Sequence, residues 1–267
     1  MSTPTPIPIP KHSPWISQCL VINALLKREV TTKFGEYRLG FFWMLLEPLV
    51  GVLVVGVVLG TVAARTVPEI PYSFFVLNGM LILKLLTSPM NTGMNAVGAN
   101  QGLLVYPTVR PLDTFIARFL LQLLNTMFSF FLFCIIAMWI GISLSFDHLD
   151  VLFVCYLITW VSGCGLGLIL GVAAAHFRET EKVLMVVQRP LIFVSAVLFP
   201  ISVVPPGMQQ YLLYNPLVHT IELSRWAMFP HYHAEGCNLL YPSIFAIVVL
   251  SIGLTLFHGN RNFISQS

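Results

Sequence analysis

Two charged residues interrupt stretches of the sequence that are otherwise apolar. Glu47 is the single charge between residues 39 and 64, and Lys84 is the single charge between residues 72 and 88. A charge inside a membrane span costs roughly 2.5–3.5 kcal/mol on insertion scales, so each of these residues needs a reason to be there. A carboxylate or an ammonium at this depth is the kind of group that lines the path of a polar solute.

Both residues also have a structural interpretation. Glu47 precedes Pro48, which can kink a helix beside the carboxylate, so Glu47 either faces a polar conduit or forms a structural ion pair. Lys84 lies near the inner end of its apolar stretch, and its ammonium can instead snorkel to the membrane surface. The stretch that follows, residues 88–101 with Asn91, is too polar to face lipid. We expect it to line an aqueous vestibule or to leave the membrane.

An aromatic and basic group marks the start of the first apolar stretch, and it consists of Tyr37, Arg38 and Trp43. Aromatic belts and positive charges at the inner membrane surface explain this group without any further role. The same residues suit an anionic, sugar-rich ligand, because aromatic rings stack on sugars and arginine forms paired hydrogen bonds with anions. Both interpretations stay open.

A second group of candidate residues lies in segment 205–238, the longest segment expected on the outer side. Glu222 and Arg225 are spaced i, i+3, so they share one helix face and are expected to pair, and His219 precedes them by one turn. Apolar residues around them indicate that the segment dips back into the bundle as one or two re-entrant helices. We expect this segment to form the outer gate.

Two short charged segments, residues 104–118 and 176–182, are expected on the inner side. Both are compact, and the first is punctuated by prolines before it becomes helical, with Asp113 near the helix N-terminus. Such segments suit the docking of another protein, although ordinary hydrated turns look the same. The candidate docking residues are Arg110, Asp113, Arg118, Arg178, Glu179 and Glu181.

The sequence carries no signal for catalysis or for metal binding. No glycine-rich loop ends in Gly-Lys-Ser/Thr, which excludes a nucleotide site of the P-loop type. The seven histidines are scattered, and Cys237 is the single cysteine expected outside, so we expect neither a metal site nor a structural disulfide. Gly163, Gly167 and Gly171 have the small-xxx-small spacing that is typical of close helix packing rather than of a phosphate cradle.

Composition determines which elements must position these residues. The 14 Lys and Arg and 11 Asp and Glu residues make only 9% of the 267 residues charged, against about 25% in soluble domains. The hydrophobic share is 57%, above the usual range of roughly 45–50%. These values exclude a soluble globule, a disordered chain and a disulfide-rich secreted domain. At about 20 residues per span, six spans use about 120 residues and leave no room for a second domain.

The predicted fold is an all-α integral membrane protein with six transmembrane helices, because the apolar runs are continuous rather than alternating. The spans are expected at residues 39–64, 72–88, 119–142, 151–175, 190–204 and 239–257. Eleven Lys and Arg residues flank these spans on one side and two on the other, which predicts that both termini are cytosolic.

The transmembrane domain, residues 39–257, is expected between an N-terminal region, residues 1–38, and a cytosolic tail, residues 258–267. The N-terminal region starts with a proline-rich tail. Apolar residues from Trp15 to Val30 then recur at three- and four-residue steps. They predict an amphipathic helix, which either lies on the cytosolic leaflet or packs as a small helix on the bundle.

Three motifs, in this order and spacing, carry a resemblance to a known family. They are Pro107-x-Val-x-Pro-Leu-Asp-x-x-Ile-Ala-Arg118, His176-Phe-Arg-Glu179 and Asn215-Pro-Leu-x-His-x-Ile-Glu-x-x-Arg225. The chain resembles the capsular-polysaccharide export permeases (the KpsM family), which are the membrane subunits of type-two ABC exporters in Gram-negative bacteria. The resemblance covers essentially the whole chain, and it rests on the combination of motifs rather than on any one of them.

The resemblance implies a homodimer that exports lipid-linked, usually acidic, capsule polymers across the inner membrane. A separate cytosolic ATPase would bind ATP and magnesium, so this chain would be a transport subunit without a cofactor or enzymatic activity of its own. A periplasmic polysaccharide co-polymerase and an outer-membrane export channel would continue the path.

By position, the resemblance places a coupling helix in residues 104–118, a second ATPase contact in residues 176–182 and re-entrant periplasmic helices in residues 205–238. The substrate path would include Tyr37, Arg38, Trp43, Glu47, Lys84, Asn91, His219, Glu222 and Arg225. Related type-two permeases for O-antigen, teichoic acid or drugs are the nearest alternative. An ATP-independent transporter would need internal repeats and more intramembrane carboxylates, and a membrane enzyme would need clustered acids or histidines.

Overall fold

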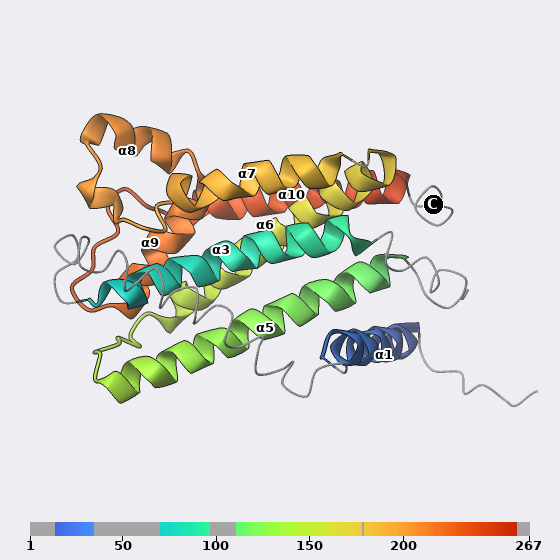
Figure 1. The fold of residues 1–267 in the computed structure, drawn as a ribbon, viewed down its shortest axis with the longest axis horizontal. Coiled ribbons are helices and arrows are strands. Elements are labelled where there is room, and N and C mark those ends of the chain that lie inside the picture. Colours follow the sequence, from blue (N-terminus) through green and yellow to red (C-terminus); the bar gives the residue numbers. More distant parts are fainter. Residues whose placement is uncertain (1–13, 35–69, 97–110, 178, 261–267) are drawn as a thin grey trace, which may run out of the picture.

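The computed structural model describes residues 14–34, 70–96, 111–177 and 179–260, and the regular secondary structure in these ranges is helical (Figure 1). The helices are α1 (Pro14–Phe34), α3 (Tyr72–Met94), α5 (Pro111–Ile140), α6 (Leu149–His176), α7 (Thr180–Val194), the 3-10 turn η1 (Ile201–Val203), α8 (Pro206–Leu213), α9 (Pro216–Met228) and α10 (Leu240–Gly259).

Helix α6 is the centre of the bundle. It packs most extensively against α3 and α10, and it also contacts α9. Figure 1 shows α3, α5, α6, α7 and α10 running lengthwise, with α8 and α9 at one end and α1 at the other. We refer to these as the α9 end and the α1 end. The far end of α10, close to the C-terminus, also lies at the α1 end.

Glycines in α6 allow its neighbours to approach at backbone distance. A Cβ atom on Gly167 would lie 2.5 Å from the carbonyl oxygen of Pro89 in α3. One on Gly165 would lie 2.7 Å from the backbone nitrogen of Leu250 in α10. No side chain fits at such distances, so the structure confirms that the glycine spacing in α6 serves close helix packing.

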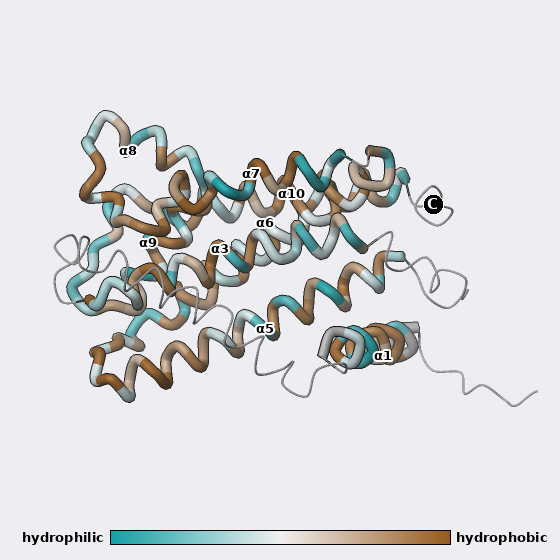
Figure 2. The backbone as a smooth tube through the Cα atoms, in the orientation of Figure 1, coloured by the Kyte–Doolittle hydropathy of each residue, from teal (hydrophilic) through white to brown (hydrophobic). Residues whose placement is uncertain are grey.

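Four helices of the described chain, α3, α5, α6 and α10, are long and apolar enough to cross a membrane. They correspond to the spans expected at 72–88, 119–142, 151–175 and 239–257, and the span expected at 39–64 lies outside the described residues. The half of α5 nearer Ile140 is almost continuously hydrophobic, and hydrophilic residues lie toward its start (Figure 2). Phe131 and Ile135 of α5 and Ile247 of α10 are among the large apolar side chains that remain exposed, as expected where helices face lipid.

The segment expected as the fifth span, residues 190–204, is only partly helical. Helix α7 begins earlier, at Thr180, and ends at Val194. At about 1.5 Å per residue it is about 22 Å long, shorter than the roughly 30 Å hydrocarbon core. It ends because Ala196 adopts a left-handed backbone conformation, with φ of 54°, at a position that neither glycine nor charge marks in the sequence.

Helix α1 packs along α5 at the α1 end. Leu25 is buried, whereas Ile16 and Leu20 on other sides of the helix are about half exposed. The structure thus shows α1 packed on the bundle, and its position on the cytosolic leaflet stays a prediction. Of the tail expected at residues 258–267, His258 and Gly259 belong to α10, whereas residues 261–267 and residues 1–13 lie outside the described residues.

Candidate functional site

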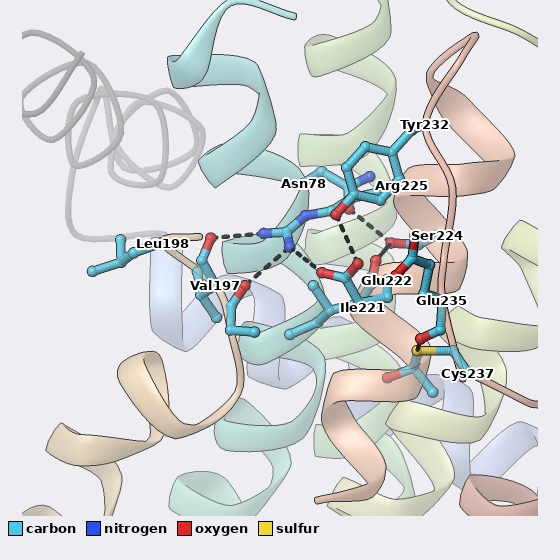
Figure 3. Close-up of polar contacts among 12 residues, drawn as sticks. Asn78, Val197, Leu198, Ile221, Glu222, Ser224, Arg225, Tyr232, Glu235 and Cys237 are labelled. Carbon is cyan, nitrogen blue, oxygen red and sulfur yellow. Dashed lines mark hydrogen bonds and ion pairs between the residues drawn. The ribbon is translucent and has the colours of Figure 1, made fainter. Parts of the chain in front are cut away.

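Most of the described candidate residues lie in three places, which we name by their residues, and His219, Glu179 and Glu181 lie outside them. The α9 cluster consists of Asn78, Glu222, Ser224, Arg225 and Tyr232 (Figure 3). The α1–α5 junction consists of Gln18, Glu29, Asp113 and Arg118, and the α3 polar face contains Lys84 and Asn91. The remaining candidates, Tyr37, Arg38, Trp43, Glu47, Arg110 and Arg178, lie outside the described residues.

The α9 cluster is centred on the ion pair that the i, i+3 spacing predicted. Arg225 Nη1 donates to Glu222 Oε1 at 2.9 Å, and both side chains have an exposed fraction of 0%. The pair is therefore confirmed, but it is buried. Removing one partner of such a pair leaves an uncompensated charge, at a cost of roughly 3–5 kcal/mol.

Arg225 also binds the chain that follows α7. Its Nη1 donates to the carbonyl oxygen of Ala196 at 2.9 Å, and its Nη2 donates to that of Val197 at 2.7 Å (Figure 3). The guanidinium carbon lies 3.6 Å from the centre of the Phe75 ring in α3. One side chain of α9 thus contacts α3 and the end of α7.

The remaining oxygen of Glu222 is bound by Tyr232, whose hydroxyl donates to Oε2 at 2.7 Å. Burial raises the pKa of Tyr232 well above its ordinary value, against a smaller lowering by Arg225, so the hydroxyl stays a donor. Close by, Ser224 donates from Oγ to Asn78 Oδ1 at 2.7 Å, and Asn78 Nδ2 donates to the sulfur of Met228. The cluster therefore joins α3, α9 and the segment after α9 through nearly complete hydrogen bonding.

His219, expected on the substrate path, is also buried, with an exposed fraction of 3%. Its Nδ1 accepts from the backbone N–H of Asn238 at 3.1 Å, which leaves the proton on Nε2, 2.9 Å from the carbonyl oxygen of Leu213. His219 therefore fixes both ends of the α9 region. His219, Glu222 and Arg225 are all buried, so none of them lines an open path among the described residues.

The α3 polar face is the more accessible part of the expected path. Lys84 and Asn91 lie seven residues apart, hence on the same side of α3, and both are partly exposed. Asn91 and Gln188 of α7 exchange two hydrogen bonds, of 3.3 and 3.2 Å. Gln188 was not among the predicted site residues, and its pairing with Asn91 becomes evident only in the folded chain.

The α1–α5 junction brings together two residues that were expected to dock another protein. Arg118 Nε donates to Glu29 Oε1 at 3.0 Å, and Asp113, 2% exposed, accepts from Gln18 Nε2 at 3.1 Å. These side chains are directed to α1. Gln18 and Glu29 were not predicted as their partners. Their spacing of eleven residues does place them three turns apart on one face of the expected N-terminal helix.

Glu179 and Glu181 remain exposed at the start of α7, as docking residues would be. His176 ends α6 close by, and Phe177 after it is 67% exposed. This short connection is one of the charged surfaces that the described chain presents at the α1 end.

Two apolar cavities lie between helices of the described ranges. The larger, of about 280 Å³, is bounded by α3, α6, α7, α9 and α10, and the smaller, of about 190 Å³, by α5, α6 and α10. Within the described ranges no group of three or more His, Cys, Asp or Glu side chains could hold a metal ion. Among the described residues, the spaces between the helices are therefore lined by apolar surface.

The model of a protein family described as ABC-2 type transporter matches residues 21–229. The chain is 38% identical over 240 residues to the polysialic acid transport protein KpsM of Escherichia coli, across 90% of this chain and 93% of that protein. It is 28% identical over 239 residues to the capsule polysaccharide export inner-membrane protein CtrC of Neisseria meningitidis serogroup A, across 88% and 89% of the two chains.

The O-antigen export system permease protein RfbA of Myxococcus xanthus is more distant, at 22% identity over 253 residues, across 92% and 95% of the two chains. These similarities extend over nearly the whole length of each protein, as the three sequence motifs implied. The chain belongs to the ABC-2 type transporter family, and it is a multi-pass membrane protein.

Proposed function

We propose that this chain is the permease subunit of an ATP-driven exporter that moves lipid-linked acidic capsular polysaccharide across the inner membrane of a Gram-negative bacterium. The observation that carries the proposal is the 38% identity to the Escherichia coli polysialic acid transport protein over nine-tenths of this chain. The scarcity of charge, 9% of residues, and the four apolar helices suit the membrane subunit of such a machine.

In this proposal the chain crosses the membrane six times, and both termini are cytosolic. The span at 39–64 comes first, and α7 with the segment after it completes the fifth. Helices α8 and α9 are re-entrant elements on the periplasmic side. The burial of ten residues of α9 supports this placement, because a helix floating free in the periplasm would leave its apolar residues exposed.

The energy comes from a separate ATPase, which binds ATP and magnesium. The chain has no P-loop sequence of its own, so an ATPase pair would dock on a homodimer of this chain at the α1 end. The exposed Glu179 and Glu181 and the segments 104–118 and 176–182 would form that seat. A periplasmic co-polymerase and an outer-membrane channel would receive the polymer.

The substrate path would run from the aromatic and basic group Tyr37, Arg38 and Trp43, past Glu47, to the α3 polar face. Lys84 supplies a positive charge there for an acidic polymer, and the partial exposure of Lys84 and Asn91 supports that role. His219, Glu222 and Arg225, being buried, would act by holding the outer gate rather than by touching sugar.

The proposal is tested in an encapsulated Escherichia coli strain that lacks its polysialic acid transport protein and receives this chain together with its own ATPase. We expect polysialic acid at the cell surface, and a loss of at least tenfold in a Lys84→Ala variant of equal membrane abundance. Lys27→Ala, which removes an exposed lysine of α1, is the matched control. Polymer that accumulates in the cytoplasm despite normal abundance of both proteins contradicts the proposal.

A second candidate is export of O-antigen, supported by the 22% identity to the O-antigen permease. A strain lacking its O-antigen permease separates the two. Restored surface O-antigen, without restored capsule in the first strain, would favour this alternative.

A further inference from the structure

Helix α7 makes few buried contacts with the rest of the described chain. Leu184 is its single buried residue, and long apolar side chains along it are exposed. Its side chains are linked to α3 by the pair of hydrogen bonds between Gln188 and Asn91. Within the described residues, side-chain packing along α7 therefore contributes little to holding the helix in place.

The chain at the end of α7 is held differently, by its backbone. The carbonyl oxygens of Ala196 and Val197 accept from Arg225, as described above. The carbonyl oxygen of Leu198 accepts from the Tyr72 hydroxyl at 2.8 Å. That of Val194 accepts from Asn215 Nδ2 at 3.3 Å, and the same amide donates to the Ser195 hydroxyl at 3.0 Å. We call residues 194–198 with these three side chains the carbonyl clamp.

The clamp owes its shape to the way α7 ends. The N–H of Ala196 donates to the carbonyl of Phe193, and the N–H of Val197 donates to the carbonyl of Ile192. This is the hydrogen-bond pattern of a helix that closes on a left-handed residue. It turns the next carbonyls away from the helix axis and leaves them free to accept from other elements.

The donors of the clamp are themselves fixed. Arg225 is held by Glu222 and lies against Phe75, and a Cβ atom on Gly79 would lie 2.8 Å from Arg225 Nη2. Asn215 is also the N-cap of α9, where its side chain accepts from the N–H of Leu217. The clamp thus fixes the end of α7 to α3 and α9, whereas the start of α7, with Glu179 and Glu181, is exposed.

From this asymmetry we infer that residues 194–198 are a fixed pivot and that α7 moves about it, breaking the Asn91–Gln188 contact when the export path opens. Arg225 is the positioning residue of this pivot and acts through the carbonyls of Ala196 and Val197. The inference rests on the proposed function for the force that moves α7, but the pivot itself exists in the resting permease.

The pivot is tested by spin-label distances between α7 and α10, which both run lengthwise in the bundle (Figure 1). One pair, Phe193→Cys with Leu240→Cys, reports the clamped end, and the other, Val183→Cys with Leu256→Cys, reports the free end. All four residues are exposed. Labels are placed in a background without native cysteines, and labelled chains are diluted tenfold with unlabelled chains so that distances arise within one subunit.

In the resting permease, without ATPase, Arg225→Gln should at least double the width of the 193–240 distance distribution. Tyr72→Phe, which deletes one clamp hydrogen bond and keeps the ring, should broaden it less. Arg189→Gln, which removes an exposed arginine of α7, is the control and should not change it. If Arg225→Gln does not fold, Tyr72→Phe carries the test; an unchanged distribution in the variants that fold overturns the clamp.

With the ATPase and a non-hydrolysable ATP analogue, the 183–256 distance should shift while the 193–240 distance stays constant. Equal shifts at both pairs, or none at either, overturn the pivot. Failure of the proposed function would be seen separately, as absence of surface polymer in the complementation strain with the wild-type chain.

Discussion

Arg118 of α5 and Glu29 of α1 form an ion pair of 3.0 Å that joins the N-terminal helix to the bundle. Arg118 Nη1 also lies 3.4 Å from the carbonyl oxygen of Asn95, just after α3. One side chain therefore links α1 to α3 and to α5, whose start belongs to the segment 104–118 where an ATPase is proposed to dock. A movement of that region would be passed to α1 through Arg118.

The Glu29–Arg118 contact predicts that a charge swap restores what each single change removes. Glu29→Arg and Arg118→Glu should each weaken the packing of α1 on α5. The double variant should recover about 0.5–1 kcal/mol of the free energy of that packing, the contribution of a partly exposed ion pair. Disulfide formation between Gln18→Cys and Asp113→Cys, in a background without other cysteines, measures the closeness of α1 and α5. Lys27→Glu, on an exposed side of α1, is the control. Crosslinking that stays low in the double variant would show that the pair does not hold α1.

The left-handed residue after α7 predicts an unusual response to glycine. An alanine in this conformation costs roughly 1–2 kcal/mol. Glycine relieves that strain but increases the conformational entropy of the unfolded chain, so Ala196→Gly should raise the free energy of unfolding by up to about 1 kcal/mol. Ala227→Gly, at an equally buried alanine inside α9, should lower it by about 1 kcal/mol. Both are measured by titration with denaturing detergent. Equal destabilisation by the two changes would contradict the left-handed conformation at Ala196.

The apolar helices could be predicted from the sequence because a bilayer sets their length and excludes charge. The span expected at 151–175 became α6, Leu149–His176, and the span at 239–257 became α10, Leu240–Gly259. The pairing of Glu222 with Arg225 was predictable for a similar reason, since an i, i+3 spacing acts within one helix.

Contacts between distant helices could not be predicted in the same way. Nothing local identifies Gln18 as the partner of Asp113, or Tyr232 as the donor to Glu222. The end of α7 was also missed, because its stop signal is the conformation of Ala196 rather than a residue type that disfavours helix. It is stabilised by Arg225, which is 29 residues further along the chain.

The glycine contacts predict that a single methyl group disturbs the centre of the bundle. In Gly167→Ala the Cβ atom would lie 2.5 Å from the carbonyl oxygen of Pro89, so α3 and α6 must separate. We expect a loss of about 1–3 kcal/mol in the free energy of unfolding, as for other overpacked cores. Gly259→Ala, where no atom lies within 4 Å of the added carbon, should change it by less than about 0.5 kcal/mol. A similar change in both variants would contradict the close approach of α3 and α6 at Gly167, because helix propensity and chain entropy both favour alanine over glycine.

Cys237, in the segment between α9 and α10, is predicted to react slowly with alkylating agents. Burial, and to a lesser extent the negative charge of Glu222, raises the pKa of this thiol to about 12. At pH 8 it should therefore hold about a thousandfold less thiolate than an ordinary cysteine of pKa about 8.5. Alkylation by iodoacetamide of a chain that retains only Cys237 should accelerate about tenfold per pH unit up to pH 11. The control is Glu235→Cys in a chain without other cysteines, because this neighbouring site is exposed and its rate should level off near pH 9. Equal rates at pH 8 would mean that Cys237 is not shielded as the structure has it, and that the segment over Glu222 opens in solution.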